Sequence, residues 1–124
     1  NEAVATLTVC NYGDAPVRTS LGFHPYFPAV GTQFDFNGAP YDADYIAHTE
    51  FVASPSDTHV AFDGMKLDIR TQNLPVYALW SDRNGQYCAE PTAEGNAFLS
   101  PARGGQFVSG HGKKCYGMKI RLIA

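Results

Sequence analysis

Two residues whose side chains can exchange protons stand next to prolines in otherwise apolar sequence. His24 is followed by Pro25 in an aromatic stretch, and Glu90 precedes Pro91 at the end of an apolar one. A glutamate is ionised at neutral pH and a histidine titrates close to it, so the two can serve as general base and general acid. Because proline cannot donate to a β-ladder, each side chain is expected near a strand end, bulge or edge, where it can reach a cleft.

Each residue also has a simpler explanation when it is taken alone. His24 has the setting of a structural histidine whose ring nitrogens are satisfied by the backbone, and Glu90 that of an exposed charge at a strand end. These explanations are favoured for either residue in isolation. The occurrence of both together, each beside a proline, favours an acid–base site.

The elements that would position them are strands, because apolar residues alternate with a period of two and stretches of helical period are absent. Asp63–Gly64 and Asp82–Gly85 read as turns between neighbouring strands. Eight prolines and twelve glycines separate the apolar segments, as turn residues between short strands do. The sequence therefore predicts an all-β fold, an antiparallel β-sandwich of roughly seven strands, in a single domain over residues 1–124. The predicted strands are Ala3–Val9, Val17–Phe27, Val60–Phe62, Met65–Arg70, Pro75–Trp80, Gln86–Glu90, Gln106–Ser109 and Cys115–Ile123.

Composition excludes several classes of function. The net charge of -3 comes from nine basic and twelve acidic residues with no block of either sign, so we expect no nucleic-acid or membrane partner. No apolar run is long enough to cross a bilayer, and the N-terminus lacks a signal-peptide pattern. Cys10, Cys88 and Cys115 form no metal or redox motif, so we interpret them as small buried hydrophobes and expect a cytoplasmic protein with reduced thiols.

Two segments of the chain resemble two segments of a known protein family, and they occur in the same order. The first runs from NYGDAP at residues 11–16 through LGF to HPYF at residues 24–27, and the second is YCAEPT at residues 87–92, followed by NAF. They are similar to the stretches of aldose 1-epimerases, or galactose mutarotases, that carry the catalytic histidine and the catalytic glutamate. A glycine-rich turn at Gly104–Gly105 before the last strands extends the similarity more loosely. The resemblance implies a galactose mutarotase-like supersandwich, complete or partial.

The resemblance also implies a reaction. His24 would protonate the ring oxygen of a sugar while Glu90 takes the proton of the anomeric hydroxyl, which interconverts the α and β anomers of a free aldose such as glucose or galactose. Tyr26 and Asp44 are the candidate substrate-binding residues. Asp42 is the alternative to Asp44, and a turn between strands is the favoured explanation of both aspartates. No metal and no organic cofactor is required.

Other readings stay open. His48, His59 and His111 fit no ligand spacing and are expected at surface or loop positions. The family draws further binding groups from an earlier half of its chain, so we expect this sequence to be an excerpt of a longer protein, or to complete its sandwich with a second copy. A non-catalytic carbohydrate-binding or assembly domain is therefore the alternative to an isomerase.

Overall fold

The computed structural model describes residues 1–54, 57–96 and 106–123. These residues form twelve strands and one helix of a single turn, and every strand pairing is antiparallel. In chain order the elements are β1 (Glu2–Cys10), β2 (Val17–Thr19), β3 (Tyr26–Pro28), β4 (Gln33–Phe36), β5 (Ala39–Asp42), α1 (Ala43–Ile46), β6 (Glu50–Ala53), β7 (Asp57–Phe62), β8 (Met65–Gln72), β9 (Val76–Ser81), β10 (Gln86–Thr92), β11 (Gln106–Val108) and β12 (Lys113–Leu122).

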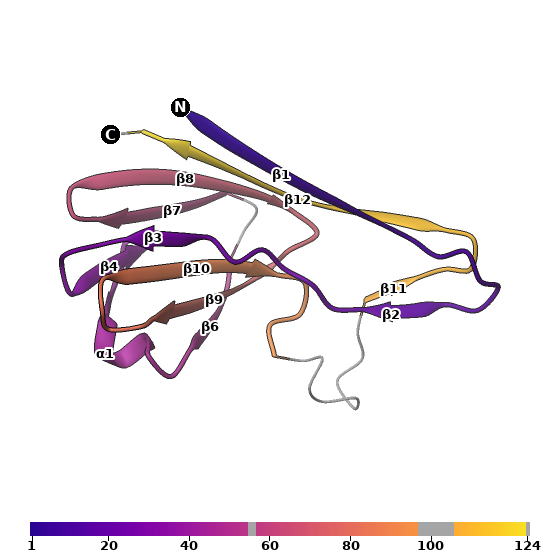
Figure 1. The fold of residues 1–124 in the computed structure, drawn as a ribbon, viewed down its shortest axis with the longest axis horizontal. Helices are drawn as coiled ribbons and strands as arrows, with labels where there is room; N and C mark the ends of the chain where they lie inside the picture. The colour runs from indigo at the N-terminus through magenta and orange to yellow at the C-terminus, as the bar shows by residue number, and fades with distance from the viewer. Residues whose placement is uncertain (55–56, 97–105, 124) are drawn as a thin grey trace.

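The strands form two main sheets and a small third one. One sheet has six strands in the order β1-β12-β8-β7-β4-β5, the other has four in the order β3-β10-β9-β6, and β11 pairs with β2 alone. Figure 1 shows the two larger sheets as layers at one end of the molecule, while β1 and β12 run on together toward the β2–β11 pair at the other end. The predicted all-β antiparallel sandwich is therefore confirmed.

An aromatic core joins the two layers. Phe34 of the six-stranded sheet stacks on Tyr87 of the four-stranded sheet, with 5.0 Å between ring centroids, and Phe62 lies 5.6 Å from Phe27 across the same gap. Burying a side chain of this size stabilises the fold by about 1.5–3 kcal/mol. The buried residues of this core are Phe27, Ala29, Phe34, Phe36, Ile46, Val60, Phe62, Leu67, Ile69, Tyr77, Leu79, Tyr87 and Ala89.

The predicted hairpins are present. Asp63 and Gly64 have φ angles of 49° and 76°, as a tight two-residue turn requires, and they connect β7 to β8. In β8, Leu67 and Ile69 are buried while Lys66 is exposed, as the alternation predicts. The Asp82–Gly85 turn likewise joins β9 to β10 as antiparallel neighbours.

Three expectations are wrong in detail. The predicted strand Val17–Phe27 is divided into β2 and β3, which belong to different sheets. The turn expected at Asp42 and Asp44 contains α1, with Asp42 as N-cap accepting a hydrogen bond from the Asp44 N–H at 2.8 Å. Cys10 and Cys115 are exposed because the β1–β12 ribbon has an open outer face, and only Cys88 of the three is buried.

The single helix of the described residues, α1, has four residues. Among the described residues no helix has the length and apolar character that a membrane span requires.

Candidate active site

An interrupted ladder along β10 brings the two proton-exchanging residues together. Tyr26 of β3 pairs with Cys88, and four residues earlier in the chain Gly22 forms an isolated bridge with Thr92. The two pairings have the same register. Residue 24 lies midway between Gly22 and Tyr26, and residue 90 lies midway between Cys88 and Thr92, so these two residues face each other. His24 is thus the cross-strand partner of Glu90, and both side chains lie on one face of the sheet.

The two prolines explain the interruption. The Phe23 N–H donates to the Pro91 carbonyl at 3.0 Å, but Pro91 has no N–H to return the bond, and Pro25 has none for the next position. His24 and Glu90 fall between these positions, where facing residues of an antiparallel pair share no backbone hydrogen bonds and their side chains approach most closely. The prediction that a strand ends, bulges or lies on an edge near Pro25 is confirmed, because β3 begins directly after Pro25 and is an edge strand of its sheet.

Glu90 lies inside its strand. The prediction that it stands at a strand end is wrong, because Pro91 and Thr92 still pair with Tyr77 and Val76 of β9. Pro91 is tolerated in β10 because the side of the strand from which its N–H is missing is the interrupted one. Glycine at residue 22 permits the close approach there, since a Cβ at Gly22 would lie 2.6 Å from the Pro91 carbonyl oxygen.

The imidazole and the carboxylate contact each other directly. His24 Nε2 lies 3.1 Å from Glu90 Oε1, and the side chains are 49% and 18% exposed, respectively. Burial raises the pKa of the Glu90 carboxyl above its ordinary value, and the neighbouring His24 opposes that shift in part. Glu90 is therefore a stronger base than a solvated glutamate, paired with a histidine that reaches solvent.

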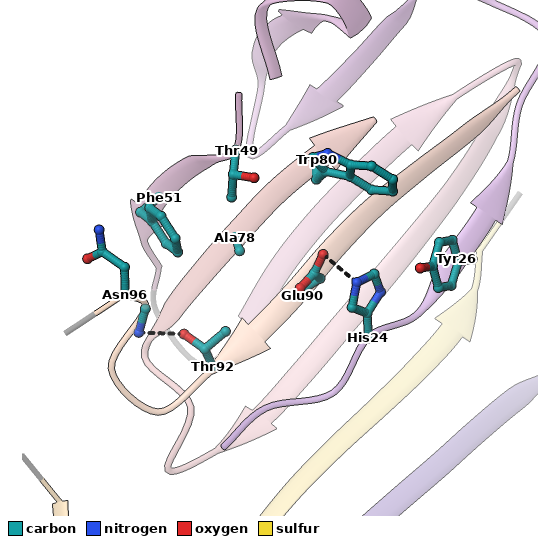
Figure 2. A pocket seen from close by; sticks show the side chains of 10 residues that line it. His24, Tyr26, Thr49, Phe51, Ala78, Trp80, Glu90, Thr92 and Asn96 are labelled. Carbon is teal, nitrogen blue, oxygen red and sulfur yellow. Dashed lines mark hydrogen bonds and ion pairs between the residues drawn. The ribbon is translucent and has the colours of Figure 1, made fainter. Parts of the chain in front are cut away.

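A pocket of about 410 Å³ opens over the pair, as Figure 2 shows. Phe51 and Trp80 present apolar surface to it, and Thr49, Thr92 and Asn96 contribute polar groups. Thr92 is fixed in place because its hydroxyl donates to the Val76 carbonyl at 2.8 Å and accepts from the Gly95 N–H at 2.7 Å. The full lining is His24, Tyr26, Thr49, Phe51, Ala78, Trp80, Glu90, Thr92, Gly95 and Asn96.

Aromatic rings hold the histidine. The Tyr26 ring is stacked on the His24 imidazole with 4.5 Å between centroids and 18° between planes. Trp80 stands edge-on to both rings, with 6.5 Å between centroids in each case. These contacts fix the orientation of the imidazole ring. Figure 2 shows Tyr26 on the side of His24 away from Glu90.

A buried thiol lies beside the pair. Cys88 is two residues before Glu90 on the same face of β10, and its strand partners are Tyr26 and Trp80. Burial, with the nearby Glu90 and Asp82 carboxylates, raises the pKa of the Cys88 thiol to about 12. The ligand atoms of His24, Cys88 and Glu90 all lie within 4.8 Å of one another, so these residues could hold a metal ion.

The structure brings together His24, Glu90 and Tyr26, three of the four residues selected from the sequence. Asp44 is exposed on α1 and does not line the pocket. Phe51 and Thr49 come from a stretch without a predicted strand, whereas Thr92 was detectable, because it follows Glu90 by two residues on the same face. The spare histidines are exposed as expected: His48, His59 and His111.

Comparison with known proteins identifies the fold. No protein-family model matches the sequence, and no curated protein does. Among solved structures, a galactose mutarotase-related enzyme from Lactobacillus acidophilus matches 100% of this chain and 58% of its own, with a TM-score of 0.77 at 13% identity. A protein of Synechocystis sp. matches 98% of this chain and 50% of its own, with a TM-score of 0.73 at 20% identity.

A third structure, described as a candidate aldose 1-epimerase of Escherichia coli, matches 98% of this chain and 56% of its own, with a TM-score of 0.71 at 16% identity. This chain thus spans about half the length of the structures that it matches. At these identities the likeness concerns the fold. The chain has the galactose mutarotase-like fold, and its register places His24 opposite Glu90 within it.

Proposed function

We propose that this chain is an aldose 1-epimerase, which interconverts the α and β anomers of a free aldose. The observation that carries the proposal is the contact of 3.1 Å between His24 Nε2 and Glu90 Oε1 on the floor of the pocket. In a cyclic aldose the ring oxygen and the anomeric hydroxyl are bonded to the same carbon. The acid and the base that serve these two oxygens must therefore lie side by side, as His24 and Glu90 do.

The proton transfers follow from this arrangement. A sugar that enters between the side chains replaces their mutual contact with one contact to each. Glu90 removes the proton of the anomeric hydroxyl, His24 in its protonated form donates to the ring oxygen, and the bond from that oxygen to the anomeric carbon breaks. Rotation of the open-chain aldehyde about its first carbon–carbon bond presents the opposite face, and the reverse transfers close the ring and restore both residues.

The surroundings suit a sugar of this kind. Phe51 and Trp80 offer apolar surface for the carbon faces of the ring, while Thr49 and Asn96 offer hydrogen bonds to its hydroxyls. Burial raises the pKa of Glu90, which strengthens it as a base.

Polarimetry or NMR exchange spectroscopy on freshly dissolved α-glucose, α-galactose and other free aldoses tests the proposal. The chain should accelerate mutarotation of at least one sugar above the buffer rate, and His24→Asn should remove about 10²–10⁴-fold of that acceleration. His59→Asn is the matched control, because His59 also contacts a carboxylate, on an exposed face away from the pocket. Absence of acceleration for every sugar, or equal loss in both variants, would contradict the proposal.

One observation favours the second candidate, a non-catalytic carbohydrate-binding domain. The chain spans only about half of the structures that share its fold. The remaining half of such a fold can supply further groups to the sugar. Saturable sugar binding in NMR titrations without any anomer exchange would select this second candidate over the first.

A further inference from the structure

Cys88 has no role in the proposed proton transfers, yet its sulfur lies beside the His24–Glu90 pair. Its side chain is buried on the pocket face of β10, between Tyr26 of β3 and Trp80 of β9 in the register. Strand alternation places Glu90 next to it on the same face, and His24 is opposite Glu90. The thiol, the imidazole and the carboxylate thus converge from three neighbouring positions of one sheet surface.

We propose that His24, Cys88 and Glu90 form a binding site for a thiophilic divalent cation of the Zn²⁺ class, and that an ion bound there blocks the acid–base pair. The blocking effect rests on the proposed epimerase function, whereas the binding does not. The ligands would be one ring nitrogen of His24, Cys88 Sγ and one Glu90 oxygen, and these three atoms all lie within 4.8 Å of one another.

The distances require little rearrangement. With bonds of about 2.0–2.3 Å to nitrogen, oxygen and sulfur, the ligands of a tetrahedral zinc ion lie roughly 3.3–3.6 Å apart. His24 and Glu90 are already 3.1 Å apart, so the ion mainly has to draw in the sulfur. Three protein ligands leave the fourth position open toward the pocket, where water would occupy it.

The donor set selects the type of ion. One thiolate, one imidazole and one carboxylate suit a borderline or soft cation, whereas Mg²⁺ and Ca²⁺ need several oxygen ligands that these three residues do not supply. Formation of the metal–sulfur bond releases the thiol proton to water. The bound ion would then be coordinated by Glu90 and by the His24 nitrogen that faces it. Neither side chain could then exchange a proton with a sugar.

The test is a titration of the full chain with Co²⁺ alone, followed by displacement with Zn²⁺, in the presence of a non-thiol reductant. A thiolate ligand in a tetrahedral cobalt site gives a sulfur-to-metal charge-transfer band in the near ultraviolet and intense visible bands. We expect these bands in a Cys10→Ser/Cys115→Ser variant, which keeps only the buried thiol. Cys88→Ala should lose the charge-transfer band, and His24→Asn should weaken the affinity at least about 10-fold.

The outcomes separate the two proposals. Loss of the bands in the Cys10→Ser/Cys115→Ser variant, or unchanged affinity in His24→Asn, overturns the metal site whether or not the chain is an epimerase. His24→Asn alters an exposed side chain, so this arm does not depend on how well Cys88→Ala folds. If the chain exchanges anomers, Zn²⁺ should abolish exchange over the concentrations at which it binds, and EDTA should restore it. Binding without inhibition overturns the blocking role.

Discussion

Two histidine–carboxylate pairs in this molecule are built in the same way and lie in different surroundings. His24 faces Glu90 across the interrupted ladder of the four-stranded sheet, and His59 faces Asp68 across β7 and β8 of the six-stranded sheet. The nitrogen–oxygen distances are 3.1 Å and 2.6 Å, and the two carboxylate side chains are 18% and 16% exposed. Neither distance nor exposure distinguishes the pocket pair as the reactive one.

The two pairs differ in the residue that faces each carboxylate from the neighbouring strand. On its other side Glu90 faces Ala78 of β9, whereas Asp68 faces Arg121 of β12, whose guanidinium donates to it at 2.9 Å. The Arg121 hydrogen bond, with His59 beside it, lowers the pKa of Asp68, while burial raises the pKa of Glu90 and His24 opposes that shift only in part. The small Ala78 side chain also leaves room for the pocket. The pair whose carboxylate faces alanine instead of arginine on the neighbouring strand is thus the one with a raised carboxylate pKa and a pocket beside it.

The largest expected effect comes from removing each carboxylate in turn. Glu90→Gln keeps the shape of the side chain and removes the base, so the rate of anomer exchange should fall by about 10²–10⁴-fold. Asp68→Asn makes the matched change in the His59–Asp68 pair, called the outer pair below, and should leave the rate of anomer exchange unchanged. NMR exchange spectroscopy on equal concentrations of folded protein measures both. A similar loss in the two variants would show that the comparison does not identify the base.

Local chemistry accounts for what the sequence predicts well in the fold. Asp63–Gly64 and Asp82–Gly85 specify their turns by themselves, and alternation fixes the buried face of β8. The stretch from β4 to β6 is harder, since its strands have four residues each and β4 is held partly by β7, about 25 residues later in the chain. Such short strands are specified by distant partners more than by their own pattern.

The candidate site divides in the same way. The prolines beside His24 and Glu90 are local signals, and they mark both residues as unusual. Their direct opposition depends on the register between Tyr26 and Cys88 and between Gly22 and Thr92, which no segment contains by itself. Cys88 could have been included from its spacing of two from Glu90, but a buried thiol has the same pattern as any small core residue.

A smaller effect is expected from the ring that orients the histidine of the pocket pair. Tyr26 is stacked on His24, and an aromatic pair of this kind contributes about 0.5–1.5 kcal/mol beyond its burial. If that energy holds the imidazole in place, Tyr26→Leu should reduce kcat for anomer exchange by about 2- to 13-fold.

Tyr26→Phe keeps the ring and should retain kcat, which separates stacking from any contact of the hydroxyl with the sugar. Steady-state kinetics over a range of sugar concentrations distinguishes the two roles. A rise in KM with constant kcat in both variants would assign Tyr26 to substrate binding instead of positioning.

The smallest effects concern the pH dependence of stability, and the two pairs should differ in sign. Glu90 has a raised pKa in the folded chain, so its protonated form contributes stability that is present below the unfolded pKa and is lost as pH rises through the folded pKa. Asp68 has a lowered pKa, so its contribution is present above the unfolded pKa and is lost as pH falls through the folded pKa.

Urea unfolding at a series of pH values, with side-chain carboxyl ¹³C titrations, measures both contributions. At pH values above the Glu90 titration, Glu90→Gln should increase the free energy of unfolding slightly, by under about 1 kcal/mol after solvent screening, because it removes a partly buried charge. Arg121→Ala should move the Asp68 pKa back toward its ordinary value and leave the Glu90 titration unchanged, since Arg121 contacts only the outer pair of these two. A shift of the Glu90 titration in Arg121→Ala would mean that the two pairs are coupled, and that β9 and β12 do not set the pKa values of Glu90 and Asp68 independently.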